Sequence, residues 1–321
     1  MIEPVLVPRS QINDTSWNTL IAKSGYPLPY STTWHLDCVS PHWKAIVWPQ
    51  HSDYQIVMPL PVRKKWGKQV IQQPFFCQFL GFFSVQKLTT AQILAFLAVL
   101  HRHFSYISSY SFHPGHTPLL RPLLTEDPDF SLSIQATYYL KTSSDVRTGF
   151  TKDRLANLKR AERWGWQVLN SSEIEPLISL FRHNHARQIT GGVNNEAYAL
   201  LRKLYTTGVQ QGMMRLQYAT LQGSIHAGCL FLEYQNQTIY IFNAADTAGR
   251  KGNARTYLLD RYLSTMPAGR FDFESPDVPS IATFYQSFGA EKQEYLTIKK
   301  NKLPFPFRQL QEWRKRWFTS T

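Results

Sequence analysis

The clearest pattern along the chain lies at residues 89–104, where apolar side chains recur at the spacing of one helical face. These positions are Ile93, Leu94, Leu97, Leu100 and Phe104. The pattern predicts an amphipathic helix, because side chains three and four residues apart lie on the same side of a helix. Thr90, near its start, is the candidate N-cap.

Weaker patterns fill the rest of the first half with short helices and strands. Helices are predicted at residues 16–22 and 32–38, and strands at residues 43–48, 54–61, 69–73, 106–112 and 134–140. Trp66-Gly67-Lys68 separates two of these strands and is typical of a hairpin turn. The mixture predicts an α/β fold of the α+β kind, with helices flanking a mixed, mostly antiparallel sheet.

The second half repeats this order of elements more clearly. A basic helix at residues 150–165 ends at Gly165, a residue type that often terminates helices. Further helices are predicted at residues 174–187, 195–211, 256–263 and 279–288, and strands at residues 166–169, 214–220, 226–234, 238–243, 270–273 and 294–299. Because the halves share an order of elements, the sequence predicts two domains of similar fold, although no repeat of residues is visible.

Composition narrows the class of partner. The 321 residues carry a formal net charge of +13, and 43% of them are hydrophobic, which is enough for a substantial core. A basic surface favours acidic partners: a nucleotide-containing cofactor, RNA or an anionic membrane. The three cysteines lack disulfide or zinc spacing and are expected to be free and buried. Without a signal-peptide pattern or an apolar run long enough to span a membrane, we expect a soluble, cytoplasmic protein.

Candidate chemistry begins with the segment that joins the strand at residues 238–243 to the helix at residues 256–263. The unpaired N–H groups at a helix N-terminus bind phosphate readily, and glycine lets the backbone approach a ligand closely. The segment therefore predicts a pyrophosphate site. Its candidate residues are Gly249, Arg250, Lys251, Gly252, Asn253, Ala254 and Arg255. An exposed turn rich in glycine and lysine is the alternative interpretation.

Tyr285 is the candidate acid for a transfer reaction. It lies one helical turn before Gly289, where a phenol could donate a proton to a leaving thiolate. Phe284 and Phe288 form an i, i+4 pair that faces the core, and Tyr285 is offset from them by one residue. A core aromatic is the alternative interpretation for Tyr285.

Carboxylates at strand ends are the candidate bases. Asp246 and Glu274 both follow strands that would end at one cleft, although a helix cap or a salt bridge explains either equally well. The backbone N–H groups at Asn243, Ala244 and Ala245 are candidates to hold a carbonyl oxygen. No histidine pair has metal-ligand spacing together with a cysteine or carboxylate, so no metal site is predicted.

These motifs, taken in order, resemble the GNAT acyltransferase superfamily. The strand, the G-x-x-G-x-A turn, the helix and the later Tyr285–Ala290 block follow the superfamily's order. Its pyrophosphate loop usually begins with Gln or Arg, whereas this chain has Gly249 there. The resemblance implies an acyltransferase fold that uses acyl-CoA, such as acetyl-CoA, as donor.

A narrower resemblance is to the FemAB/FemX-like branch. It rests on Phe271–Ser275, on Ile281–Ala290, and on Asn157, Lys159-Arg160-Ala161 and Gly165 in the basic helix. This branch carries two GNAT-like domains in tandem. The resemblance implies a degenerate domain at residues 1–149, a transferase domain at residues 150–302 and a basic aromatic tail at residues 303–321.

The FemAB/FemX-like resemblance also implies a class of reaction. Members move an acyl or aminoacyl group from acyl-CoA or aminoacyl-tRNA to an amine or hydroxyl, and many act on cell-envelope precursors. A small-molecule or envelope-precursor acceptor and tRNA are therefore candidate partners.

A different class of function stays open. The net charge and the basic aromatic stretch Trp313–Trp317 also fit an inactive GNAT scaffold that binds RNA or the surface of an anionic membrane. The alternative for this tail is that its tryptophans pack back onto the domain.

Overall fold

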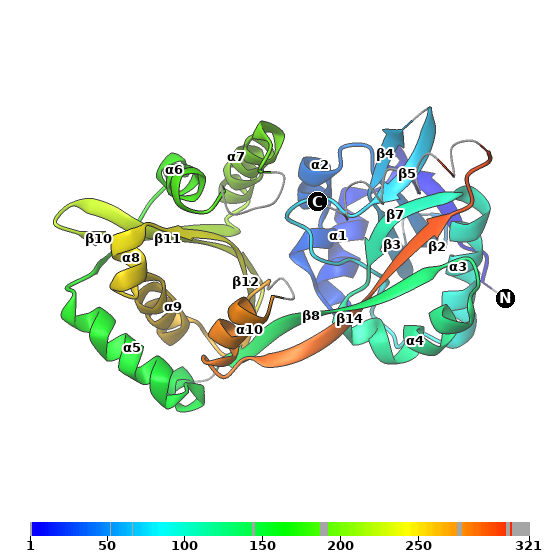
Figure 1. Cartoon of the computed structure of the whole chain (residues 1–321). Coiled ribbons are helices and arrows are strands. Elements are labelled where there is room, and N and C mark those ends of the chain that lie inside the picture. Colours follow the sequence, from blue (N-terminus) through cyan, green and yellow to red (C-terminus); the bar gives the residue numbers. More distant parts are fainter. Residues whose placement is uncertain are drawn as a thin grey trace. The chain divides into compact units, whose positions relative to one another are not determined.

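The computed structural model describes residues 2–51, 53–65, 67–142, 145–186, 192–274, 278–305 and 309. The chain forms two compact units (Figure 1). The first consists of Met1–Gln135 and Glu294–Thr321, and the second of Ala136–Gln293. Within the described part of the chain, every helix is too short or too polar to cross a lipid bilayer.

The first unit combines strands from both ends of the sequence. Its elements are β1 (Val5–Pro8), α1 (Asp14–Lys23), α2 (Thr33–Val39), β2 (Lys44–Trp48), β3 (Ile56–Leu60), β4 (Val62–Lys65), β5 (Lys68–Gln72), β6 (Phe83–Ser84), α3 (Thr90–His103), β7 (Tyr106–Ser111), α4 (Thr117–Glu126) and parts of β8 (Ser131–Thr142) and β14 (Glu291–Asn301). The cap of α3 is Thr89 rather than the predicted Thr90. Thr89 and Gln92 bond to each other's backbone N–H groups in a capping box.

The second unit holds the elements of the second half of the sequence. They are α5 (Lys152–Arg163), β9 (Gln167–Asn170), α6 (Glu175–Asn184), α7 (Asn195–Gln210), β10 (Met214–Leu221), β11 (Ser224–Tyr234), β12 (Gln237–Ala245), α8 (Thr247–Lys251), α9 (Ala254–Thr265), β13 (Gly269–Asp272) and α10 (Pro279–Gln286). Most of these elements lie where the hydrophobic pattern predicts them.

The repeated order of elements is confirmed by the pairing of strands. In the first unit α3 connects the parallel strands β5 and β7, and in the second unit α9 connects the parallel strands β12 and β13. A parallel pair needs such a crossover, because its strands run in the same direction. The neighbouring hairpins are antiparallel, so the strands around each crossover form the mixed, mostly antiparallel arrangement that the sequence predicts. In the first unit β1, β2, β3 and β6 form a separate four-stranded antiparallel sheet.

The boundaries between units differ from the predicted ones at residues 149/150 and 302/303. The chain enters the second unit within β8, at Gln135–Ala136, and leaves it within β14, at Gln293–Glu294. The end of β8 pairs with β13, whereas the end of β14 pairs with β7. The final strand of each half therefore completes the sheet of the other half, and a boundary drawn from element order misses this exchange. The predicted tail, including Trp313–Trp317, lies outside the described residues.

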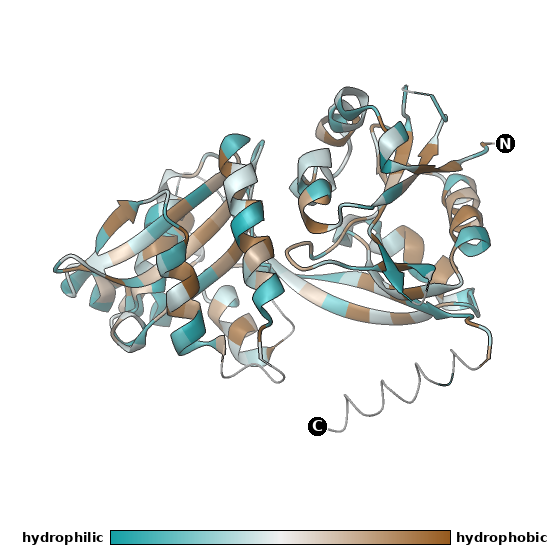
Figure 2. Cartoon of the chain, turned by 90° about the horizontal axis from the view of Figure 1, so that it is seen from above, coloured by the Kyte–Doolittle hydropathy of each residue, from teal (hydrophilic) through white to brown (hydrophobic). Residues whose placement is uncertain are grey.

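Helices cover both faces of the sheet in the second unit. In Figure 1, α6 and α7 lie on one side of β10 to β12, and α8 and α9 lie on the other. The α9 side holds an aromatic core, in which the rings of Phe231 and Tyr262 stack with centroids 3.8 Å apart. The hydropathy colours of Figure 2 show brown and teal turns on the same helices, as amphipathic packing requires. Cys38, Cys77 and Cys229 are free and buried, as predicted.

Two helices, α4 and α8, were not predicted from the sequence because of their residue types. Helix α4 contains Pro118 in its first turn and Pro122 inside it, and proline normally counts against a helix. Helix α8 occupies residues predicted as a glycine-rich turn, and its cap is Asp246, which accepts a hydrogen bond from the Gly249 N–H. The predicted exposed turn is therefore a short helix with a buried glycine.

Gly249 is required by close packing rather than by its backbone angles. A Cβ atom added there would lie 2.2 Å from the carbonyl oxygen of His226. We therefore expect Gly249→Ala to lower the free energy of unfolding by about 1–3 kcal/mol, since α8 must move away from β11. Chemical denaturation measures this loss. Gly25→Ala is the control, because nothing lies within 4 Å of its added Cβ. Equal stabilities for both variants would contradict the packing argument.

Buried histidines should make the first unit sensitive to acid. His35 is 0% exposed, and burial lowers its pKa to about 3. The unfolded chain binds a proton below about pH 6.5, whereas the folded chain stays neutral, so stability falls as the pH falls from about 6.5 towards 3. This one group contributes a slope of about 1.4 kcal/mol per pH unit.

The variant His35→Phe tests this slope. Neither ring nitrogen has a hydrogen-bond partner among the described residues, so an apolar ring loses no bond. We expect unfolding curves between pH 4 and 7 to show a shallower loss of stability for the variant. An unchanged slope would mean that His35 is protonated in the folded state.

Candidate functional site

The site begins where β12 and β13 stop pairing. The two parallel strands share rungs that end at Ile239 and Asp272. Strand β12 then continues to Ala245 beside β11, whereas β13 ends at Asp272. Beyond Ile239, β12 has no further rung with β13 among the described residues, so backbone groups there are open to another partner.

A β-bulge decides which side chains of β12 lie at this opening. The register against β11 shifts between Tyr240 and Phe242, which leaves Ile241 as the extra residue. One extra residue reverses the alternation of faces along a strand. Asn243 consequently shares the face of Tyr240 and reaches α9, whereas Phe242 packs against Phe181 of α6.

Asn243 is the centre of a polar cluster on the α9 face. Its Oδ1 accepts a hydrogen bond of 2.8 Å from Arg255, and its side chain also bonds the Tyr285 side chain. Tyr285 is 5% exposed, and its ring stacks on Phe273 with centroids 4.4 Å apart. Burial raises the pKa of Tyr285 to about 12, so the phenol stays protonated at neutral pH.

The buried face of α10 carries Tyr285 and not Phe284, contrary to the sequence prediction. Tyr285 and Phe288 both lie in the aromatic core, and Phe284 is only partly buried. The helix α10 therefore turns Tyr285 inward, towards Asn243. Tyr285 is therefore a core aromatic whose side chain also bonds Asn243.

A second arginine lies beside the cluster without a carboxylate partner. Arg154 of α5 is 6% exposed; its Nε donates to Ser287 Oγ at 2.9 Å and its Nη1 to Thr256 Oγ1 at 2.6 Å. Its guanidinium lies over the rings of Phe284 and Phe288 at 4.3 and 4.5 Å. Burial, followed by the charge of Arg255, lowers the pKa of Arg154 to about 10. No ion pair to Arg154 occurs among the described residues, so its positive charge is uncompensated.

The start of α9 adds further positive potential. The cap residue Asn253 has a left-handed φ of 54°, and its side chain makes no capping hydrogen bond. The first N–H groups of a helix have no partner within the helix, and here Ala254, Arg255 and Thr256 carry them. Arg255 also lies 5.2 Å from the ring of Phe284, the same ring that Arg154 contacts. Two guanidinium groups and a helix N-terminus thus come together.

Most residues of the predicted pyrophosphate-binding segment, residues 249–255, bond or pack against other parts of the protein. The N–H groups of Gly249, Arg250, Gly252 and Asn253 donate to residues of the same segment. Gly252 packs against Trp164 and Trp166 and accepts a hydrogen bond from Trp166 Nε1 at 2.7 Å. Arg250 donates to the carbonyl of Ala245, and Lys251 is exposed. Of the loop residues, Arg255 is the one whose side chain reaches the cluster around Asn243.

The two predicted carboxylates differ in their contacts. Asp246 caps α8 and also pairs with His226 Nδ1 at 2.9 Å. Glu274 has a left-handed φ of 45°, and its N–H donates to Asp272. Asp272, which the sequence reasoning missed, is 3% exposed at the last rung before the strands part. Burial raises the pKa of Asp272 to about 6.

The predicted carbonyl-binding amides are partly engaged. The N–H of Ala245 donates to His185 Nε2 at 3.2 Å, which removes it from the candidates. The N–H of Ala244 points towards its partner Gly228 on β11, by alternation from the Asp246 N–H that donates to His226. Asn243 remains as a candidate, and its side chain adds a polar group. Among the described residues no cluster of three or more metal-binding side chains occurs.

A signal for Arg154 was present in the sequence. Arg154, Leu158 and Ala161 are the buried residues of α5, at i, i+4 and i+7. An arginine on the apolar stripe of a helix is unusual, because burying a charge is costly. No comparable pattern indicated Asp272, whose burial depends on the neighbouring strand.

Comparison with known proteins finds a matching domain family and several similar structures. A model of the acetyltransferase (GNAT) domain matches residues 151–273. FemX superposes with a TM-score of 0.64 at 12% identity, over 93% of this chain and 98% of that one. A tandem GNAT protein from the clavulanic acid biosynthesis pathway gives 0.55 at 11%, over 94% and 99%. L-PGS from Bacillus licheniformis gives 0.52 at 11%, over 97% and 98%. No curated protein matches the chain.

The diverging strand pair, the crossover helix and these matches define a GNAT-superfamily fold. More narrowly, the chain has the tandem-domain GNAT fold of the FemX-like kind.

The uncompensated charge of Arg154 leads to a stability prediction. We expect Arg154→Met to change the free energy of unfolding by less than about 1 kcal/mol, because removing an unpaired buried charge offsets the lost hydrogen bonds. Methionine keeps an apolar contact with Phe284 and Phe288. Urea denaturation measures the change.

Arg147→Met is the matched control in the same unit. Arg147 forms two hydrogen bonds of 2.7 Å with Asp260, which is 0% exposed. Its removal leaves a buried carboxylate unpaired and should cost about 3 kcal/mol or more. A loss as large for Arg154→Met would show that Arg154 stabilises the fold and is not reserved for a ligand.

Proposed function

We propose that this protein transfers an acyl or aminoacyl group from acyl-CoA or a similar donor to an amine or hydroxyl of an acceptor. The observation that carries the proposal is the pair Arg154 and Arg255 beside the opening between β12 and β13. The GNAT match over residues 151–273 supports the same class of reaction. An envelope precursor is the proposed acceptor class, from the FemX-like resemblance.

Donor binding is assigned to the start of α9. Acyl-CoA and aminoacyl-tRNA both carry phosphates, and a helix N-terminus flanked by arginines attracts them. The N–H groups of Ala254 to Thr256 and the guanidinium of Arg255 would supply hydrogen bonds. The buried Arg154 would add positive charge. The phosphate site is therefore shifted from the centre of the Gly249–Ala254 segment towards Arg255.

The reacting carbonyl is assigned to the open edge of β12. Attack by the acceptor places negative charge on the carbonyl oxygen, and fixed N–H donors stabilise it. The N–H of Asn243 would supply such a donor, because it leaves β12 on the side away from β11. Burial raises the pKa of Tyr285 to about 12, whereas a thiol has a pKa of about 8.5. Proton transfer from Tyr285 to a leaving thiolate would therefore be unfavourable. We therefore assign Tyr285 to positioning Asn243.

A base is needed when the acceptor is an ammonium. Asp272 is the proposed proton acceptor, because it lies at the last rung before β12 and β13 part, and burial raises its pKa to about 6. Asp246 and Glu274 are retained as alternatives, with Asp246 disfavoured by its cap and its pair with His226.

Ligand-induced stabilisation tests the donor. A panel of acyl-CoAs and charged tRNA should include at least one compound that raises the melting temperature by about 5 °C at a hundredfold excess over Kd. Arg255→Ala should abolish this shift. Arg261→Ala is the control, since Arg261 lies on the same helix, carries the same charge and pairs with Glu162.

The same assay separates the competing function. If no acyl-CoA and no charged tRNA stabilises the protein, the transferase proposal fails. Binding to RNA or anionic vesicles that falls steeply with salt, survives Arg255→Ala and requires residues 303–321 would favour an inactive scaffold.

A further inference from the structure

The first unit contains a cavity that the transferase proposal does not use. It has a volume of about 700 Å³. Strand β3 pairs with β2 as far as Leu60, and the chain then passes through Pro61 into β4, which joins the other sheet beside β5. The two sheets part at this proline, and the cavity lies in the fork between β2 and β4. Its size is within the range of pockets for small molecules.

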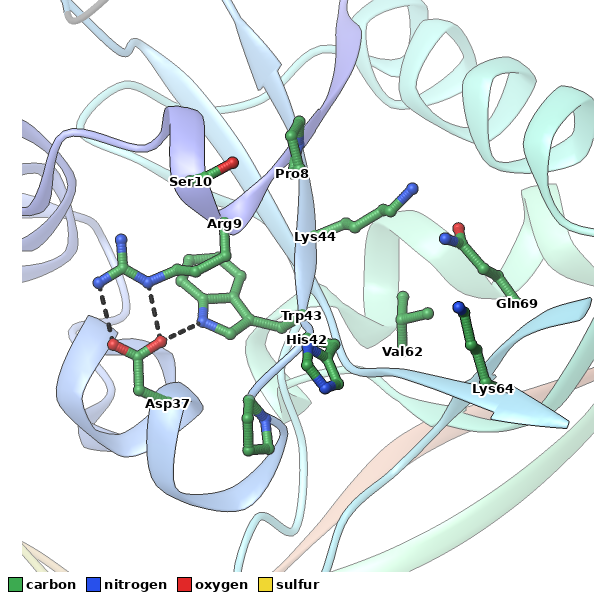
Figure 3. Close-up of a pocket in the computed structure, with 11 residues that line it drawn as sticks. Pro8, Arg9, Ser10, Asp37, His42, Trp43, Lys44, Val62, Lys64 and Gln69 are labelled. Atoms are coloured by element: carbon green, nitrogen blue, oxygen red, sulfur yellow. Dashed lines mark hydrogen bonds and ion pairs between the residues drawn. The ribbon is translucent and has the colours of Figure 1, made fainter.

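One side of the cavity is rigid and electrically balanced. Arg9 donates from Nε and Nη2 to the two oxygens of Asp37 at 2.8 and 2.9 Å, and Trp43 Nε1 donates to Asp37 at 2.8 Å (Figure 3). Trp43 is itself 0% exposed, and its ring packs on Trp17. The charge of Arg9 is thus already committed to carboxylates, so Asp37 is no counter-charge for a ligand or for other cations.

The opposite side carries cations of a different kind. Figure 3 shows Lys44, Lys64 and Gln69 together across the cavity from Asp37. Lys64 and Gln69 are direct cross-strand partners on β4 and β5, so their side chains leave the hairpin on one face. No ion pair to Lys44 or Lys64 occurs among the described residues, and Asp37 is the one acidic residue of the lining. The lining therefore has an excess of positive charge.

Apolar groups complete the wall between these two sides. Val62 lies two residues before Lys64 on the same face of β4, and Pro8 is the cross-strand partner of Lys44. A ligand here would meet apolar surface along its body and ammonium and amide groups at one end. This division of chemistry is usual for sites that bind small amphiphilic molecules.

We propose that this cavity binds a small molecule with an oxyanion head group, a phosphate or a carboxylate, and an apolar body. Lys44 and Lys64 bind the oxyanion, the amide of Gln69 donates a hydrogen bond to it, and Val62, Pro8 and Pro41 contact the body. The site is built within the first unit and does not depend on the donor site around Arg255.

Titration calorimetry on the full chain tests the proposal with three probes of one shape: phenyl phosphate, benzoate and benzyl alcohol. The background variant Arg255→Ala removes the donor site as a second place for anions. We expect at least one of the two anions to bind and the neutral alcohol to bind about tenfold more weakly or not at all. Comparison of phenyl phosphate with benzoate identifies the head group.

The variant Lys44→Gln with Lys64→Gln should weaken anion binding by about tenfold or more, since both charge-assisted contacts are lost. Lys68→Gln with Lys87→Gln is the control for net charge. Lys68 follows Lys64 on the hairpin but leaves β5 on the face opposite Gln69, and Lys87 is exposed elsewhere. The control should change the Kd by less than about twofold at equal ionic strength.

Three results would overturn the proposal. Neither anion binds the background protein; the neutral alcohol binds as tightly as the anions; or the control variant loses as much affinity as the cavity variant. The last result would assign the binding to overall charge. None of the three would affect the transferase proposal, because the donor site is already disabled in the background.

Discussion

The separation of β12 from β13 is the constraint on which the functional architecture depends. Both strands are held in place elsewhere: β12 by β11, and β13 by the end of β8. Because the strands share only their first rungs, the open backbone of β12 is positioned by rigid neighbours and needs no flexible loop. The bulge at Ile241 then turns Asn243 towards α9 and gives the opening a polar side chain.

The buried arginine at this opening has different neighbours from the buried ion pair elsewhere in the second unit. Arg147 is matched by the buried Asp260, which is how a fold normally accommodates a buried charge. Arg154 is buried with hydroxyl groups and aromatic rings as its neighbours, and Arg255 adds to its charge. Within the described part of the chain Arg154 has no ion-pair partner, which suits the anionic donor proposed above. This arrangement is expected of a binding site rather than of a stabilising core.

Both proposed sites arise where a strand loses a partner. In the second unit β12 parts from β13, and in the first unit the chain leaves β2 at Pro61 to join β5. Inside a sheet, neighbouring strands already pair most backbone N–H and C=O groups. Ligands therefore meet unpaired backbone groups mainly where the pairing stops. The exchange of β8 and β14 between the units also means that neither half of the sequence completes its own sheet.

By resemblance, the motifs around Gly249 and Tyr285 indicated the tandem GNAT-type fold. Hydrophobic periodicity by itself predicted most helices and strands and their repeated order, because alternation and helical spacing are local properties. It failed at α4 and α8, where prolines and glycines are tolerated by packing that local rules ignore. The motifs named Arg255, Asn243 and Tyr285, and they also named Gly249 and Gly252, which pack against His226 and two tryptophans. Only the tertiary structure decided that Arg154 is buried without an ion pair to any described residue, that Asp272 is buried and that β8 and β14 change units. Burial, missing counter-charges and strand exchange are relations between residues far apart in the chain, and no local pattern encodes them.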